Sequence, residues 1–384
     1  MTKSMPSRLG SFMQAAEARL LAINPGSTST KFGLFRNEEA VHVATLRHDD
    51  EDMAQFVGRP ILEQREYRSA LIERDLAARG FDLKALTGAI GRGGLLRPLA
   101  SGTYRVNDTM LEELTRAERG EHAANLGAFL AKDIAERAGT EAYVVDPVSV
   151  DEWPDRARFS GTAHIARQCL SHALNTKAVA KRYAKEVERP YESLRLIVVH
   201  LGSGISVSAH QGGRMIDVTN SREEGAFSSE RAGSVPAEQL VNLCFSGKYT
   251  AKEIKNLLFH KGGFSSYLHT KDLAEVERRI AAGDKAAAAV FDAMVYQIAK
   301  EIGAMAAVLG GKIDALLVTG GMAHSQKLTD ELRRFVDWIA PLAIFPGEDE
   351  LRAMAEGVLR VLRSEEPVHE LASMPAHEVQ PCLA

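Results

Sequence analysis

The sequence contains little cysteine. Its three cysteines, Cys169, Cys244 and Cys382, lie far apart in a chain of 384 residues. An odd number at such spacings provides neither a disulfide framework nor the paired spacing of a zinc site. We therefore expect a protein of the reducing cytoplasm whose fold depends on neither.

Long apolar runs and an excess of positive charge are absent as well. No run approaches the ~18 uncharged apolar residues that a membrane helix needs, and residues 1–18 lack the apolar core of a secretory signal. Lys and Arg number 47 against 51 Asp and Glu, so the net charge is −4. We therefore expect no membrane and no nucleic acid among the partners.

The sequence does have enough apolar material for two cores, since 45% of its residues are hydrophobic. A chain of this length fits two domains. Residues 1–18 are expected to form an N-terminal extension. Residues 365–384, which include Pro367, Pro375 and Pro381, are expected to form a loose C-terminal tail.

A strand–turn–strand pattern opens each half of the chain. Apolar segments at 20–23 and 31–35 flank the small-residue turn 24–30, and segments at 196–199 and 205–209 flank the turn 202–204. This internal repeat favours a duplicated α/β fold with a cleft between the halves, although two unrelated hairpins would give the same pattern. Periodicity predicts further helices at 61–79, 109–118, 121–138, 285–309, 325–339 and 349–363, and strands at 142–145 and 315–318.

Three Gly/Ser/Thr turns at strand ends, 24–30, 202–204 and 319–322, are suited to binding phosphate. Such turns bring several backbone N–H groups and hydroxyls together. The common nucleotide motifs are missing, because Gly311-Lys312 and Gly247-Lys248 lack the following Ser or Thr of a P-loop and no dinucleotide fingerprint occurs.

The residues of these turns resemble the phosphate loops of the acetate and butyrate kinase family. The similarity lies in Asn24–Lys31, Gly91–Gly94, His200–Gly204 and Thr319–Gly321, and it covers about residues 19–365. Segments typical of the butyrate kinase branch are Gly102–Asn107, His172–Asn175, Cys244–Thr250 and Pro346–Glu350.

This resemblance implies an actin-like fold of the sugar kinase/Hsp70 type with two domains and an interdomain cleft. Residues 19–150, closed by a helix at 349–364, would form the first domain, and residues 151–348 would form the second with the adenosine site. ATP and Mg²⁺ would bind in the cleft, and a short-chain carboxylate would be phosphorylated to an acyl phosphate. A homodimer or a higher homo-oligomer is expected.

The chemistry of that reaction indicates which residue types to seek. A carboxylate is already ionised at pH 7 and needs no general base, so the protein must offset the repulsion between two anions by positioning and positive charge. With the resemblance, Arg92 is the expected clamp for the substrate carboxylate. Arg231 and His172 are expected to stabilise the transferring phosphoryl group.

The remaining site residues follow from the same resemblance. Asp146 is expected to hold Mg²⁺ through water, and Asp349 or Glu350 to act on the metal side. The expected nucleotide-binding residues are Asn24, Ser27, Thr28, Lys31, Gly202, Ser203, Gly204, Gly320 and Gly321. Structural roles remain open for several: a turn arginine at 92, an ion pair of Arg231 with Glu230 or Glu223, and helix-terminal acids at 349 and 350.

Two other functions remain open. A nucleotide-dependent binding or regulatory protein could share the fold, although keeping Arg92, His172 and Arg231 together argues against it. A kinase for a hydroxyl substrate would need a carboxylate base, and no sugar-kinase signature is present. The preferred acid is open between three and five carbons, possibly branched, because each CH₂ contributes only ~0.8 kcal/mol.

Overall fold

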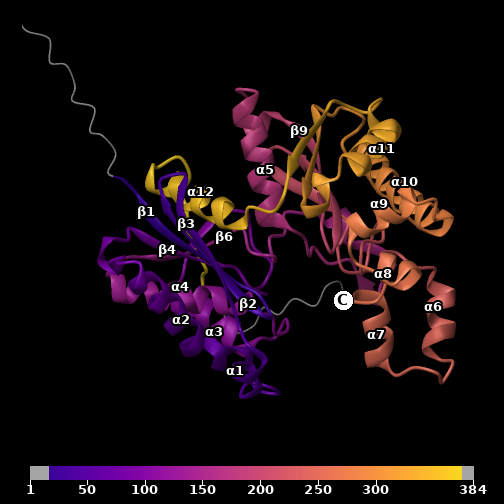
Figure 1. Cartoon of the computed structure of the whole chain (residues 1–384). Coiled ribbons are helices and arrows are strands. Elements are labelled where there is room, and N and C mark those ends of the chain that lie inside the picture. Colours follow the sequence, from indigo (N-terminus) through magenta and orange to yellow (C-terminus); the bar gives the residue numbers. More distant parts are fainter. Residues whose placement is uncertain (1–16, 374–384) are drawn as a thin grey trace, which may run out of the picture.

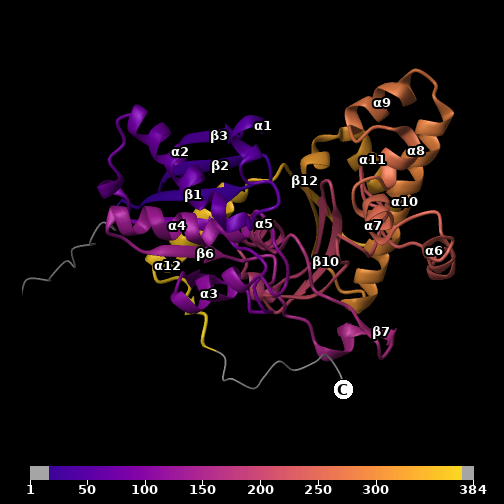
Figure 2. The same cartoon turned by 90° about the horizontal axis from the view of Figure 1, so that it is seen from below.

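The computed structural model describes residues 17–373, which form two α/β lobes, each built on one large sheet (Figure 1; Figure 2). The first part of the chain contains β1 (Arg19–Pro25), β2 (Ser29–Arg36), β3 (Glu39–Arg47), α1 (Asp50–Ala54), α2 (Arg65–Ala78), β4 (Gly88–Arg92), β5 (Thr103–Arg105), α3 (Asp108–Arg116), α4 (Asn125–Ala138) and β6 (Ala142–Val145). The middle contains β7 (Phe159–Thr162), β8 (Ile165–Ala166), α5 (Ala173–Glu186), β9 (Arg195–Leu201), β10 (Ile205–Gln211) and β11 (Arg214–Val218). The last part contains α6 (Ala237–Cys244), α7 (Ala251–Phe259), α8 (Gly263–Leu268), α9 (Leu273–Ala281), α10 (Lys285–Val308), β12 (Ala315–Gly320), α11 (Gln326–Val336), β13 (Leu342–Pro346), α12 (Glu350–Leu362) and β14 (Val368–Glu370).

The two sheets repeat one topology. The first has the order β14-β5-β6-β4-β1-β2-β3 and the second β11-β10-β9-β12-β13. In the first, β1 is antiparallel to β2 and parallel to β4, which is parallel to β6; β9, β10, β12 and β13 are related in the same way. The strands β3 and β11 complete the match, since each is antiparallel to its neighbour, β2 or β10. The duplication predicted from the strand–turn–strand pattern is therefore confirmed, and it extends over five strands.

The central strands read as apolar runs because both faces of each sheet are covered. Leu20–Ile23 of β1 and Leu196–Val199 of β9 are fully buried. In the first lobe α4 packs on β4 and β6 and α12 on β1 and β4, and in the second α10 packs on β9 and β10. The helix α5 contacts β9 and β12 and also meets α12, so these two helices join the lobes (Figure 1).

This topology brings the predicted turns to two facing edges. The carboxyl ends of parallel strands lie at one edge of a sheet. The turn 24–30 and Arg92 therefore share an edge of the first sheet, and the turns 202–204 and 319–322 share an edge of the second. The segment Gly347–Asp349 leaves that second edge and enters α12, which lies on the first sheet.

The C-terminal region corrects one prediction. Residues 365–373 are not a loose tail, because Val368–Glu370 forms β14, which is parallel to β5 at the edge of the first sheet. Leu371 is buried and its carbonyl accepts a hydrogen bond from Asn107. The proline content suggested a tail, but one exposed strand edge is enough to order a short segment. The predicted extension 1–18 and the rest of the tail lie mostly outside the described residues, and the domain boundaries stay a prediction.

Candidate active site

Arg92, the last residue of β4, occupies a buried place at the edge of the first sheet. Only 6% of it is exposed, and its Nε lies 3.2 Å from Glu350 Oε1. Its Nη1 is buried and has no hydrogen-bond partner anywhere in residues 17–373. A buried arginine N–H without an acceptor is costly, so this geometry fits an anionic ligand that supplies one.

The neighbouring glycines fix that place. A Cβ at Gly91 would lie only 2.0 Å from the carbonyl oxygen of Gly127, and one at Gly127 would overlap the main chain of Arg92. Strand β4 and the first turn of α4 therefore touch backbone to backbone. This contact fixes the position of Arg92 at the end of β4.

The turn between β1 and β2 carries the first predicted nucleotide residues. Asn24 donates a hydrogen bond from Nδ2 to Glu350 Oε2, so it shares that carboxylate with Arg92. Ser27, Thr28 and Lys31 are exposed on the turn and at the start of β2, in reach of a ligand from solvent.

Arg68 of α2 is a buried residue that donates hydrogen bonds to this turn, and the sequence analysis did not identify it. Its side chain is fully buried and donates hydrogen bonds to the carbonyl oxygens of Gly26 (2.8 Å) and Ser29 (3.2 Å) and to Thr30 Oγ1 (3.0 Å). No carboxylate within residues 17–373 bonds to it; the remaining acceptors are Gln64 Oε1 and the Ser27 carbonyl. Burial lowers the pKa of Arg68 to about 10, which leaves it cationic at neutral pH beneath the turn.

The second lobe contributes His200, the penultimate residue of β9, next to the turn 202–204. His200 is buried, and its Nε2 lies 3.0 Å from Glu348 Oε1. The His200 hydrogen bond is the main reason why the pKa of Glu348 lies below its usual value. A Cβ at Gly202 would collide with both groups, and one at Gly204 would collide with the Arg231 guanidinium. These two glycines therefore allow His200, Glu348 and Arg231 to approach the turn, on which Ser203 is exposed.

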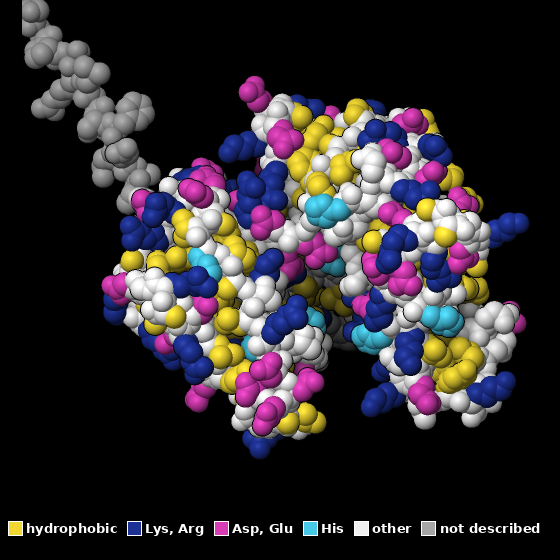
Figure 3. All heavy atoms as spheres, in the orientation of Figure 1, with side chains coloured by type: hydrophobic (Ala, Val, Ile, Leu, Met, Phe, Trp, Pro, Cys, Tyr) yellow, Lys and Arg dark blue, Asp and Glu magenta, His cyan; other side chains and the backbone are white. Residues whose placement is uncertain are grey.

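His172 and Arg231 also lie close to His200 and the turn 202–204. The His172 ring precedes α5 and stacks on His200 with centroids 3.7 Å apart. Burial, followed by the charges of His200, Arg231 and Arg92, holds the pKa of His172 well below 6.5. Arg231 Nη1 donates to the carbonyl oxygen of Ser221 at 2.8 Å. Because the charges of Arg231 and Arg92 both act on His172, these three side chains lie near one another. Figure 3 shows a hollow between the two lobes, with histidine and acidic side chains at its wall.

The acidic run 348–350 divides its carboxylates between three directions. Glu348 faces His200 of the second lobe, and Glu350 faces Arg92 and Asn24 of the first. Asp349 instead caps α12 by accepting a hydrogen bond from the Arg352 backbone N–H. Of the two predicted metal-side residues, Glu350 lies beside Arg92 and Asn24, and its role toward a metal stays a prediction. Glu348, which the sequence analysis did not select, bonds to His200.

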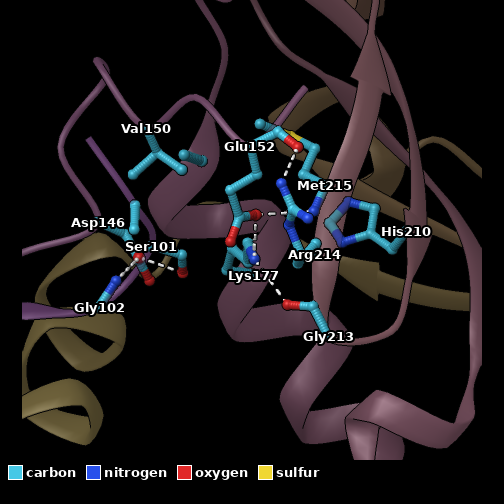
Figure 4. A network of polar contacts seen from close by, with 12 residues as sticks. Ser101, Gly102, Asp146, Val150, Glu152, Lys177, His210, Gly213, Arg214 and Met215 are labelled. Carbon is cyan, nitrogen blue, oxygen red and sulfur yellow. Dashed lines mark hydrogen bonds and ion pairs between the residues drawn. The ribbon is translucent and has the colours of Figure 1, made fainter. Parts of the chain in front are cut away.

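Asp146 follows β6 and has a structural engagement. Its Oδ1 accepts hydrogen bonds from Ser101 Oγ (2.7 Å) and the Gly102 backbone N–H (2.8 Å), as Figure 4 shows. Its φ of +38° is unusual for a residue with a side chain. Holding the Ser101–Gly102 loop is therefore its visible role, and its role toward a metal stays a prediction.

The last predicted turn, 319–322, contacts the end of β9. Gly320 has a φ of +94°, and a Cβ there would overlap the Leu201 main chain. Gly321 has open space around its Cα, which leaves room for a ligand.

No group of three or more His, Cys, Asp or Glu within residues 17–373 is arranged to hold a metal ion. The carboxylates near the predicted site still fit Mg²⁺, since that ion keeps several waters and takes only one or two carboxylates. The same range includes no helix that combines the length and apolar character required to cross a bilayer.

Comparisons with known proteins agree with this geometry. The sequence profile of the Acetokinase family matches residues 160–339. Butyrate kinase 2 of Clostridium acetobutylicum is 50% identical over 349 residues, which is 91% of this chain and 98% of that protein.

Solved structures show the same fold. The acetate kinase of Porphyromonas gingivalis superposes with a TM-score of 0.74 at 17% identity, over 89% of this chain and 99% of that one. A propionate kinase from Francisella tularensis gives 0.70 at 17% identity, over 88% and 98%. The predicted actin-like, two-lobed architecture is confirmed.

Proposed function

Since the chain belongs to the acetokinase family, we propose that it transfers the γ-phosphoryl group of ATP to a short-chain carboxylate, giving ADP and an acyl phosphate. The observation that carries the proposal is the buried Arg92 guanidinium, whose Nη1 has no hydrogen-bond partner within residues 17–373, near His172 and Arg231. A planar guanidinium matches the two oxygens of a carboxylate. The arrangement thus provides an anion clamp next to groups suited to a phosphoryl group.

The reaction needs no proton transfer. A carboxylate oxygen of the substrate attacks the γ-phosphorus, the new O–P bond forms, and the bond to the β-phosphate oxygen breaks as ADP leaves. Arg92 holds the carboxylate, while Arg231 and His172 donate to the oxygens of the transferring group. These donors favour the transition state because negative charge accumulates on those oxygens.

The nucleotide and the metal are assigned to the facing turns. Asn24, Ser27, Thr28 and Lys31 would contact the phosphates from the first lobe, and Gly202, Ser203 and Gly204 from the second. Gly320 and Gly321 would lie along the adenosine. Glu350, with Asp146 through water, would hold Mg²⁺, which neutralises phosphate charge when bound.

The proposed substrate is butyrate or a related acid of three to five carbons. The support is the 50% identity to a butyrate kinase. Because each buried CH₂ contributes ~0.8 kcal/mol, or roughly fourfold in affinity, acids of neighbouring length should overlap as substrates. A cytoplasmic location and a homo-oligomer also stay predictions.

The test is to incubate the protein with ATP, Mg²⁺ and a series of acids from two to six carbons, and to trap acyl phosphate with hydroxylamine. We expect hydroxamate with a maximum near four carbons, and none from an Arg92→Ala variant. No hydroxamate with any acid, from protein that still binds ATP by calorimetry, would contradict the proposal and favour a binding protein.

A further inference from the structure

The hydroxyl of Ser206 is the hydrogen-bond partner of His172. Ser206 lies on β10 directly opposite His200 of β9, and it is fully buried. Its Oγ is 3.1 Å from His172 Nδ1, and within residues 17–373 no other partner bonds to that hydroxyl. The His172 ring is therefore held on one side by His200 and at Nδ1 by Ser206.

The direction of this hydrogen bond follows from hydrogen-bond accounting. A hydroxyl has one proton, and a neutral imidazole carries a proton on only one nitrogen. If Nδ1–H donated to Ser206, the serine proton would have no acceptor in a fully buried place, which is unfavourable. If Ser206 donates instead, Nδ1 is the acceptor and the imidazole proton lies on Nε2.

We propose that Ser206 is a positioning residue that keeps His172 in the Nε2–H tautomer, so that an uncharged imidazole can donate a hydrogen bond to the transferring phosphoryl group. The inference rests on the proposed function for what the donor does, but the tautomer itself belongs to the free protein. Nothing in it requires a positively charged histidine.

An uncharged donor is what the surroundings of His172 demand. Burial, together with the charges of Arg231 and Arg92, opposes a second proton that would make the ring cationic. In the opposite neutral tautomer, Nε2 would present a lone pair to an anionic phosphoryl group and repel it. The neighbouring serine therefore determines whether the ring attracts or repels the reacting group.

The adjacent ring shows the same device with another donor. Asn175 Nδ2 lies 2.9 Å from His200 Nδ1, and the same amide donates to Thr319 Oγ1, whose hydroxyl donates to the Gly347 carbonyl oxygen. Nδ1 of His200 therefore accepts, and its Nε2–H points at Glu348. In both stacked imidazoles Nδ1 accepts a hydrogen bond from a neighbouring side chain, and the ring proton lies on Nε2.

The experiment has a spectroscopic and a kinetic arm. Long-range ¹H–¹⁵N spectra of protein labelled in histidine should show a protonated Nε2 and an unprotonated Nδ1 for His172, whose signals are identified by their loss in His172→Gln. In Ser206→Ala we expect a mixture of tautomers and a kcat lower by on the order of tenfold, with the KM values for ATP and acid within about twofold. Ser206→Thr, which keeps the hydroxyl, should recover part of the activity.

Ser208→Ala is the matched control. Ser208 lies two residues along the same strand, is equally buried, and bonds to the Val198 carbonyl and His210, away from the hollow. Its kcat should stay within about twofold of the original protein. A proton on Nδ1 of His172 in the unmodified protein would overturn the proposal, as would an unchanged kcat in Ser206→Ala. If Ser206→Ala fails to fold, the spectrum of the unmodified protein decides alone, and that spectrum needs no catalytic activity.

Discussion

At the scale of single residues, Arg231 offers the sharpest test of the phosphoryl-transfer step. Its guanidinium is anchored on the Ser221 carbonyl and lies against Gly204 of the second turn. Burial lowers its pKa, yet an arginine starts high enough to stay charged at neutral pH. In the proposed reaction this charge acts mainly in the transition state, so Arg231→Ala should lower kcat by ~10³–10⁵ and leave ATP affinity within a few fold in calorimetry.

Arg334→Ala is the control for that variant, since Arg334 is exposed on α11 and pairs only with Glu331 in the described structure. It should leave kcat unchanged. Arg231→Lys should retain only a fraction of the activity, because an ammonium group cannot reproduce the planar fork. If Arg231→Ala instead raised the KM for ATP and kept kcat, the arginine would serve ground-state binding.

Other residues show where sequence reasoning ends. The sequence predicts a metal-side carboxylate at Asp349 or Glu350, but these residues lie where an irregular segment enters α12, and no periodicity there sets the direction of the side chains. Only the structure shows that 348 and 350 face the two lobes while 349 caps the helix. Arg92, His172 and Arg231 were predicted because the reaction needs positive charge and because they lie in motifs that resemble those of the kinase family; their roles stay predictions.

At the scale of elements, the turn 24–30 depends on a helix distant in sequence. Arg68→Met should remove every hydrogen bond that α2 donates to this turn through the guanidinium. Bonds from charged donors contribute ~1.5–3 kcal/mol each, but the carbonyls of a surface turn can recover water. We therefore expect a loss of about 3 kcal/mol in urea unfolding, and a KM for ATP at least tenfold higher.

The control is Arg74→Met, on the exposed side of the same helix, which should change both quantities little. Arg68→Lys keeps the charge but reaches fewer acceptors, so it should restore only part of the ATP affinity. An unchanged KM for ATP in Arg68→Met would mean that the turn holds its shape without the arginine.

Helices and strands could be predicted where their burial leaves an apolar run or a periodic pattern in the sequence. The strands β1, β9 and β12 and the helix α10 appear as apolar runs or long periodic segments, and the sequence placed all four. The edge strand β3 alternates exposed and partly buried residues, so no continuous apolar run marks it in the sequence. Strand β14 has three residues, which only the edge of β5 makes into a strand.

At the scale of the whole molecule, a buried ion pair connects the segment after β6, which carries Glu152, to the second lobe. Lys177 of α5 is 1% exposed, and its Nζ lies 2.6 Å from Glu152 Oε2 and 2.9 Å from the Gly213 carbonyl oxygen. Glu152 also accepts a hydrogen bond from the Met215 backbone N–H at 2.7 Å (Figure 4). Segment, helix and the β10–β11 hairpin therefore meet at one pair of charges.

Removing one partner of such a pair leaves a buried charge, which typically costs 3–5 kcal/mol, whereas removing both charges costs much less. Lys177→Met should therefore lower the free energy of unfolding by ~3–5 kcal/mol, and adding Glu152→Gln to that variant should recover a substantial part, since the amide oxygen still accepts from Met215. Arg59→Met, which breaks an exposed pair with Glu63, should cost less than ~1 kcal/mol. Urea unfolding measures all three. If the double variant were no more stable than Lys177→Met, the lost stability would come from packing and the Gly213 contact rather than from an uncompensated charge, and the two lobes would be joined mainly by apolar contacts.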